Sequence, residues 1–150
     1  MSFVIPAANV TDRKRVTRAT GNIPQTAQTA TFTVVGAVRL ISIVGRVTTA
    51  IQAAAVNLKL TSNPTVGADS DICANADLNN QPAGTVLGIT GTLATALQIS
   101  ATEGALPDQV TPVVLQPGTL DVVTDASRTG QVEWTATYEP ITADGAMVAL

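Results

Sequence analysis

The sequence predicts an all-β protein, a jelly-roll-like antiparallel β-sandwich of about eight strands. Short segments rich in threonine and valine recur between turn residues, and no long amphipathic helical pattern competes with them. Residues 132–139 alternate strictly between apolar and polar side chains, as a half-buried strand does. Only four residues are aromatic, so the core of the sandwich must rest mainly on aliphatic side chains.

The first 27 residues differ from the remainder of the chain. They contain Pro6 and Pro24, a cluster of cations and no sustained periodicity. The cations of this basic cluster are Arg13, Lys14, Arg15 and Arg18. We therefore expect an extended N-terminal arm over residues 1–27 and a single β-sandwich domain over residues 28–150.

The sandwich domain divides into segments of strand and turn character. Strands are predicted over residues 29–35, 38–49, 56–61, 84–90, 92–100, 110–115, 119–124, 132–139 and 146–150. Gly45 interrupts the longest of these segments and is interpreted as a bulge or bend. Residues 62–83 are rich in turn-forming residues, with one helical turn expected from Ile72 to Leu78.

The chain lacks the side chains on which most catalysis depends, because it has no histidine and only one cysteine, Cys73. Histidine is the usual general base near neutral pH, and a single thiol can form neither an internal disulfide nor a thiolate metal site. No serine lies in a Gly-x-Ser-x-Gly setting, and no glycine-rich phosphate loop is present. We expect a non-enzymatic protein with no catalytic residues, no cofactor and no metal.

Two sets of acidic residues bear on this expectation. Residues 69–79 contain three aspartates but lack the glycine and the closing glutamate of a calcium loop. Turn-forming Asx residues or an irregular surface calcium site remain as alternatives there. Glu133 and Glu139 are roughly 20 Å apart along one strand, whereas the paired carboxylates of glycosidases lie about 5–9.5 Å apart.

Charge is sparse and unevenly distributed along the chain. Charged residues make up 13% of the sequence, against about 25% in an average domain. Residues 1–59 carry a net charge of +6 and residues 60–150 a net charge of −9. This asymmetry indicates either different partners at opposite ends or contact between the basic part of one subunit and the acidic part of another. Alternatively, the fold interleaves the two halves and the charges average out.

The basic cluster allows three interpretations: contact with nucleic acid phosphates, docking onto an acidic protein surface, or a solvated lead-in to the fold. No aromatic residues are interleaved with the cations, and no nucleic-acid-binding module surrounds them. We therefore favour docking through Arg13, Lys14, Arg15 and Arg18, without sequence-specific binding of nucleic acid. No segment approaches the roughly 20 apolar residues of a membrane span, so no membrane partner is expected.

Trp134 and Tyr138 share one face of the predicted strand at 132–139 with two aliphatic residues. A sugar-stacking platform is one interpretation of this pair. In a chain with so few aromatic residues, burial of both rings offers the largest contribution to the core, and we predict that they are buried.

The closing segments of the chain resemble a known family. Residues 129–140, TGQVEWTATYEP, and residues 144–148, DGAMV, are similar to the last strands of small virion proteins of tailed bacteriophages. The resemblance extends over residues 30–150 as a pattern rich in threonine, alanine, valine and glycine.

This resemblance implies a β-sandwich that trimerises on the capsid lattice as a decoration or cement protein. The partner would be the major capsid protein, and the location would be the exterior of the virion, after synthesis in the host cytoplasm. Residues 1–27 would then be an extension that grips the capsid. The alternative is a receptor- or carbohydrate-binding domain of a phage fibre or spike.

Overall fold

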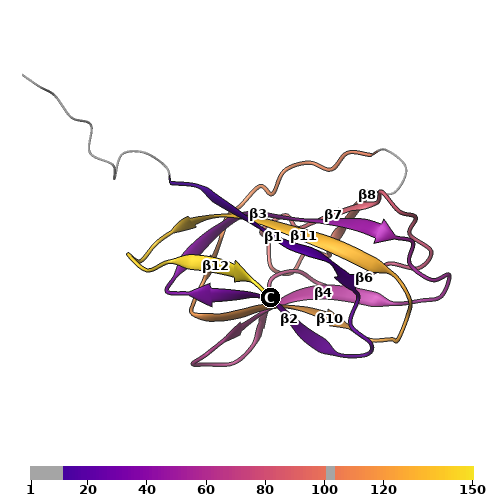
Figure 1. Ribbon diagram of the computed structural model, residues 1–150, viewed down its shortest axis with the longest axis horizontal. Helices are drawn as coiled ribbons and strands as arrows, with labels where there is room; N and C mark the ends of the chain where they lie inside the picture. The colour runs from indigo at the N-terminus through magenta and orange to yellow at the C-terminus, as the bar shows by residue number, and fades with distance from the viewer. Residues whose placement is uncertain (1–11, 101–103) are drawn as a thin grey trace, which may run out of the picture.

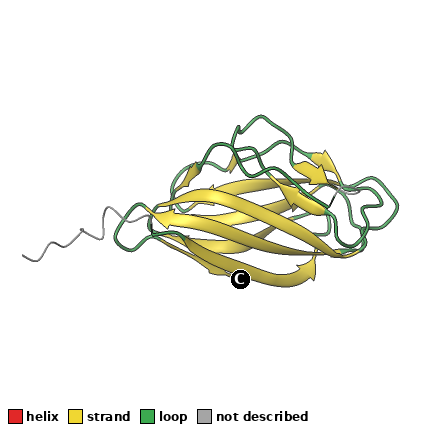
Figure 2. Cartoon of the chain, turned by 90° about the horizontal axis from the view of Figure 1, so that it is seen from above, coloured by secondary structure: helices red, strands yellow, loops and turns green. Residues whose placement is uncertain are grey.

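The computed structural model describes residues 12–100 and 104–150, and within them the chain contains twelve strands and no helix. The strands form two antiparallel sheets that pack together, as Figures 1 and 2 show. Each sheet has one apolar face that must be removed from water, and stacking the two faces achieves this. The predicted all-β sandwich is confirmed.

Sheet A consists of six strands. Its order is β1 (Lys14–Asn22), β11 (Gln131–Pro140), β3 (Val38–Thr49), β7 (Val86–Gly88) and β8 (Gln98–Ser100), and β9 (Val113–Leu115) also pairs with β3. The strands β7 and β9 occupy different stretches of the same β3 edge.

Sheet B also consists of six strands. Its order is β12 (Ala146–Ala149), β2 (Gln28–Val35), β10 (Gly118–Thr124), β4 (Asn57–Pro64) and β5 (Ser70–Asp71), and β6 (Ala76–Asp77) also pairs with β4. The first four strands of the chain alternate between the sheets, as do the last three, β10, β11 and β12. Segments distant in sequence are thereby brought side by side.

The core lies between the sheets and is mainly aliphatic. Burial along β11 alternates without interruption from Gln131 to Tyr138, as its sequence predicts. Trp134 and Tyr138 retain 3% and 5% of their surface, so the prediction that both are core residues is confirmed. The largest fully buried side chains of the same core include Phe32, Leu40, Leu58, Leu60 and Leu120.

Of the bulge or bend predicted at Gly45, the structure excludes the bulge. Gly45 pairs in register with Trp134, and the register shifts between β11 and β3 fall elsewhere. A Cβ atom placed on Gly45 would lie 2.7 Å from Cζ3 of the Trp134 ring. The glycine therefore leaves the space that the indole occupies, an arrangement known from other sheets.

The structure differs from the expected boundary at residue 27, because residues 14–22 form a strand of the sandwich. β1 pairs with β11 from Lys14 opposite Tyr138 to Asn22 opposite Gln131. The physical reason is that β11 would otherwise be an unpaired edge, and that Val16 of β1 adds to the core. Residues 1–11 of the expected arm lie outside the described residues.

The helical turn expected from Ile72 to Leu78 is also wrong. The amide of Ile72 donates to the carbonyl of Leu60, and that of Leu78 donates to the carbonyl of Val56, both at 2.9 Å. These bonds attach the segment to the edge of β4, so it forms the short strands β5 and β6. The strands expected over residues 84–90, 92–100 and 110–115 are present in shorter form as β7, β8 and β9.

Candidate functional site

The basic cluster is divided between the two faces of sheet A, because side chains alternate along β1. Arg15 lies opposite Thr137, on the outer face of the sheet. Lys14 and Arg18 lie opposite Tyr138 and Trp134, on the side that faces the core. Lys14, Val16 and Arg18 are two positions apart in the sequence, so in a strand they share the face of the apolar Val16. This spacing is the signal that could have predicted the division.

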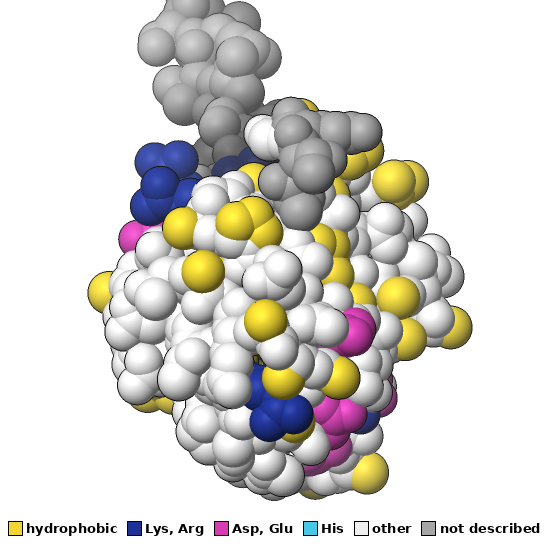
Figure 3. Space-filling model, turned by 90° about the vertical axis from the view of Figure 1, so that its right-hand side faces the viewer, with side chains coloured by type: hydrophobic (Ala, Val, Ile, Leu, Met, Phe, Trp, Pro, Cys, Tyr) yellow, Lys and Arg dark blue, Asp and Glu magenta, His cyan; other side chains and the backbone are white. Residues whose placement is uncertain are grey.

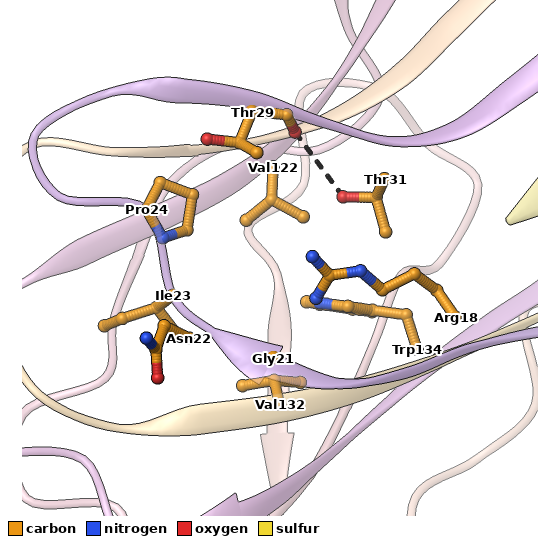
Figure 4. A pocket seen from close by; sticks show the side chains of 10 residues that line it. All are labelled: Arg18, Gly21, Asn22, Ile23, Pro24, Thr29, Thr31, Val122, Val132 and Trp134. Carbon is orange, nitrogen blue, oxygen red and sulfur yellow. Dashed lines mark hydrogen bonds between the residues drawn. The ribbon is translucent and has the colours of Figure 1, made fainter. Parts of the chain in front are cut away.

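Arg18 is part of the packing between the sheets. Its guanidinium lies against the ring of Trp134 in a small hollow between the two sheets, as Figure 4 shows. Its Nε donates a hydrogen bond to the carbonyl oxygen of Leu150 at 3.3 Å. A cation placed on an indole face is a favourable contact. The role that the structure gives to Arg18 is to cover Trp134 and to hold the end of the chain beside β1.

The outer face of sheet A carries two ion pairs, and we call it the sheet A face. Arg13 Nε lies 3.1 Å from Glu139 Oε1, and Arg46 Nη2 lies 3.2 Å from Glu133 Oε1. Between these two charged rows lie Arg15, opposite Thr137, and a group of uncharged side chains. The uncharged side chains form the centre of the face and are Thr17, Ser42, Val44, Thr135 and Thr137.

Two arginines of the sheet A face have no carboxylate partner among the described residues. Arg15 and Arg39 are both exposed, and no ion pair with either is formed within 12–100 and 104–150. Arg39 lies opposite Glu139, whose carboxylate binds Arg13 instead. These two side chains can therefore attract a carboxylate of another molecule.

Sequence reasoning missed Arg39 and Arg46 as members of this surface. The two residues are seven positions apart, so an ideal strand would place them on opposite faces. A register shift leaves Ile41 without a counterpart on β11, since Leu40 pairs with Tyr138 and Ser42 with Thr137. This bulge reverses the alternation and turns both arginines outward.

The two sheets carry opposite charge. The strand residues of sheet A contain five cations and two carboxylates, a net charge of +3. Those of sheet B contain Lys59 and three aspartates, a net charge of −2. The fold therefore interleaves the two halves of the sequence in part, because β11 brings Glu133 and Glu139 between β1 and β3, and a positive excess remains on the strands of sheet A.

The acidic residues of sheet B are held in local hydrogen bonds. Asp121 is 2% exposed, and its carboxylate accepts hydrogen bonds from Gln28, Asn63 and Thr119 at 2.7, 3.2 and 2.6 Å. Asp69 lies on the other side of Gln28 and accepts a bond from the same amide nitrogen at 2.9 Å. These contacts bind the strands of the sheet together on its outer side.

The aspartates considered for a calcium loop also point to separate partners. Asp71 lies 2.7 Å from the Lys59 ammonium, and this bond, with one from Thr61, lowers the pKa of Asp71 although partial burial opposes the shift. Asp77 accepts hydrogen bonds from the amides of Val56 and Asn79. Within the described part of the chain, no three His, Cys, Asp or Glu side chains are grouped so that they could hold a metal ion.

Cys73 is buried and unpaired. Burial raises the pKa of its thiol to about 11, so the reactive thiolate is scarce at neutral pH. Its sulfur accepts a hydrogen bond from the amide of Leu60 at 3.3 Å. The cysteine therefore behaves as a small core residue.

Two hollows among the described residues are small, and the one beside Arg128 has a volume of about 210 Å³. The one beside Gln109 has a volume of about 150 Å³ and is lined by a single ionisable side chain, Asp108, whereas ligand pockets usually measure about 300–1,000 Å³. One end of the molecule, shown in Figure 3, presents mainly uncharged side chains with few cations and carboxylates. Among residues 12–100 and 104–150, no helix has the length and apolar character needed to cross a membrane.

Comparisons with protein-family models, with curated proteins and with solved structures found no match to this chain. The candidate site therefore rests on the geometry of the sandwich itself. It is a surface, the sheet A face, with the partner-free Arg15 and Arg39 as its most available charges.

Proposed function

We propose that this chain is a non-enzymatic capsid decoration protein of a tailed bacteriophage, which binds the major capsid protein through the sheet A face. The observation that carries the proposal is the pattern of that face. Its threonine-rich centre lies between charged rows, and Arg15 and Arg39 are left without carboxylates of their own chain. Interfaces between proteins commonly combine neutral contact area with charged and polar groups around it.

The charge of the sheet A face favours an acidic partner. Four arginines and two glutamates belong to it, so it carries an excess of two positive charges. The threonine centre offers hydroxyl groups, one pair of which, on Thr17 and Thr135, already bond to each other at 3.1 Å. A face of this kind binds by area and by complementary charge, which suits a cement protein on the outside of a capsid.

A jelly-roll topology is the finer form of the fold that we propose. The support for it is the strand order, in which β1-β11-β3-β7 faces β2-β10-β4-β5, with β12 added beside β2. The homotrimer and the absence of sequence-specific nucleic-acid binding belong to the same proposal. The alternative, a carbohydrate-binding fibre domain, loses its aromatic platform because Trp134 and Tyr138 are buried.

Mass spectrometry of purified virions of the phage that encodes this chain tests the proposal. We expect a copy number in the hundreds, close to that of the major capsid protein, because a decoration protein covers the whole shell. A handful of copies would instead assign the chain to a tail or vertex, and its absence from the particle would refute a virion role.

A further inference from the structure

Arg128 borders a hollow of about 210 Å³ at the end of the sandwich where β1 ends and β11 begins. The other residues that line it are Asn22, Gln25, Thr129 and Gly130, so no carboxylate belongs to its wall. Arg128 is the single cation of residues 60–150, and it belongs neither to the basic cluster nor to the sheet A face. We call this place the Arg128 hollow.

The charge of Arg128 has no counterion in this chain. Arg128 is half-buried, and no carboxylate within residues 12–100 and 104–150 forms an ion pair with it. Asp125, three positions earlier, accepts hydrogen bonds from Asn57 at 2.8 and 2.7 Å, and these bonds lower the pKa of Asp125 more than the charge of Arg128 does. Arg128 Nη1 donates to the carbonyl of Ser127, while Nε is enclosed and meets no acceptor among the described residues. A half-buried charge is costly without an opposite charge beside it, so the arginine favours an anion in the hollow.

The neutral wall of the hollow offers hydrogen-bond donors. Thr49 Oγ1 donates to Gln131 Oε1 at 3.0 Å, and Gln131 Nε2 donates to Asn22 Oδ1 at 3.1 Å. Because the side-chain oxygen of Asn22 is the acceptor in this row, its Nδ2 group is left to donate. The hydroxyl of Thr129 and the outer N–H groups of Arg128 are further donors of the same wall. Several donors around one cation are the arrangement that binds an oxyanion.

The loop that carries Arg128 is held in place on both sides. Gln25 Nε2 donates to the carbonyl of Arg128 at 2.7 Å. The amide of Gln52 donates to the carbonyl of Thr129 at 3.0 Å, and the amide of Thr129 donates to the side chain of Gln52 at 3.2 Å. A site whose backbone is already fixed loses little conformational entropy when it binds a ligand.

We propose that the Arg128 hollow is a binding site for a single carboxylate group, with Arg128 as its anchor. A carboxylate carries one negative charge, which one arginine compensates, whereas a phosphate group carries about −1.5 to −2 at neutral pH. The planar guanidinium also matches the planar carboxylate in shape. The proposal goes beyond the capsid role of the chain and stands without it.

The test is a titration of the intact, isotope-labelled chain with sodium acetate, followed by nuclear magnetic resonance. Sodium chloride and sodium sulfate at equal ionic strength are titrated in parallel. The signals to follow are the enclosed Nε–H of Arg128 and the side-chain amide of Asn22. We expect both signals to shift with acetate along a saturating curve, with half-saturation at about 1–100 mM, the range of a weak ligand.

Two variants of the hollow and one control accompany the titration. Asn22→Asp keeps an oxygen that accepts the bond from Gln131 and replaces the free N–H donors with a negative charge. Arg128→Gln removes the anchor. Each should raise the half-saturating acetate concentration by about tenfold or more, because a charge-assisted contact is lost. Arg15→Gln removes an exposed charge outside the hollow and should bind acetate as the wild type does.

The proposal is supported if acetate saturates the wild type and Arg15→Gln but neither variant of the hollow. It is overturned if acetate does not saturate the wild type, if chloride shifts the same signals equally, or if sulfate binds more tightly than acetate. Wild-type affinity in both Asn22→Asp and Arg128→Gln would overturn it as well.

Cosedimentation with capsids identifies the source of the carboxylate. Weaker attachment of Asn22→Asp than of the wild type would assign the carboxylate to the capsid protein, and unchanged attachment would assign it to a soluble carboxylic acid. The acetate titration needs no capsid, so its result is separate from that of the proposed function.

Discussion

The two edge strands β1 and β12 lie close to each other on one side of the sandwich, yet they differ in kind. β1 has nine residues, of which Lys14, Arg15 and Arg18 are cations, and a register shift follows Arg18. β12 has four residues, all uncharged, and pairs with β2 without a shift. The β1 edge of the sandwich therefore carries charged residues, and the neighbouring β12 edge carries none.

This difference shows that two neighbouring edge strands can be protected from unwanted pairing to different extents. Charged side chains and bulges are the usual means by which an edge strand avoids pairing with its own kind. β1 has both, and its outer side belongs to the basic sheet A face. β12 has neither, and the exposed Val148 lies on its outer side. The cations of β1 support our proposal of an acidic partner for the sheet A face, and β12 contributes no charge to that face.

The largest expected effect separates β1 from the segment before it. Deleting residues 1–22 removes β1 and should lower the free energy of unfolding by roughly 3–5 kcal/mol, because Trp134 loses its cover much as in a core truncation. Deleting residues 1–11 leaves the strand in place and should change stability little. Urea denaturation followed by tryptophan fluorescence measures both. Equal stability of the two deletions would show that β1 is not an integral strand.

The next effect concerns the space that Gly45 leaves for the Trp134 ring. Gly45→Ala should destabilise the sandwich by about 1–3 kcal/mol, because the new Cβ would overlap the Trp134 ring and the packed core cannot yield freely. Ser42→Ala on the outer side of the same strand is the control and should stay within about 0.5 kcal/mol. Thermal unfolding of both variants gives the comparison. A neutral Gly45→Ala would mean that the indole does not need this space.

A smaller effect distinguishes two members of the basic cluster. Arg18→Ala should cost roughly 0.5–2 kcal/mol of stability, through the lost contact with the Trp134 face and the lost packing of its stem. Arg15→Ala, three residues away on the outer side, should stay within about 0.5 kcal/mol. Denaturant titration under identical conditions is the measurement. Equal losses of stability in the two variants would contradict this distinction between Arg15 and Arg18.

The smallest effect is expected on sheet B, in strands β4 and β5. The strands β2 and β10 separate these two from β12. Asp71→Asn should cost about 0–1 kcal/mol at pH 7, since the pair with Lys59 is partly exposed. The pKa of Asp71 is lowered from its ordinary value of 3.8. The carboxylate therefore stabilises the fold above that pH and loses its contribution as the pH falls through the lowered pKa. A difference between variant and wild type that persisted in strong acid would contradict this assignment.

Much of the fold followed from local patterns. The alternation of residues 132–139 predicted β11 and the burial of Trp134, because a period of two needs no knowledge of distant residues. β1 was missed since it contains a single large apolar residue, Val16, and its stability comes from pairing with β11 more than a hundred positions later. The short strands β5 and β6 exist for the same reason, as attachments to β4.

The candidate site was only half predictable. The sequence identified Arg13, Lys14, Arg15 and Arg18 as a group, but period-two alternation divides them between the two sides of the sheet. Arg39 joins the sheet A face only because the chain bulges at Ile41, and the position of a bulge depends on the partner strand. Sequence composition gives the number of cations; the pairing of strands decides which of them face a partner.

The central claim is that the sheet A face binds the capsid, and cosedimentation with purified capsid particles tests it most directly. The variant Arg15→Gln/Arg39→Gln removes two exposed positive charges. The control Thr65→Glu/Asn75→Glu adds two negative charges at exposed positions near sheet B, so both change the net charge of −3 by the same amount. We predict weaker attachment of the arginine variant, more so at low salt, and unchanged attachment of the control. Equal attachment of both variants, or a loss confined to the control, would contradict the assignment of this face.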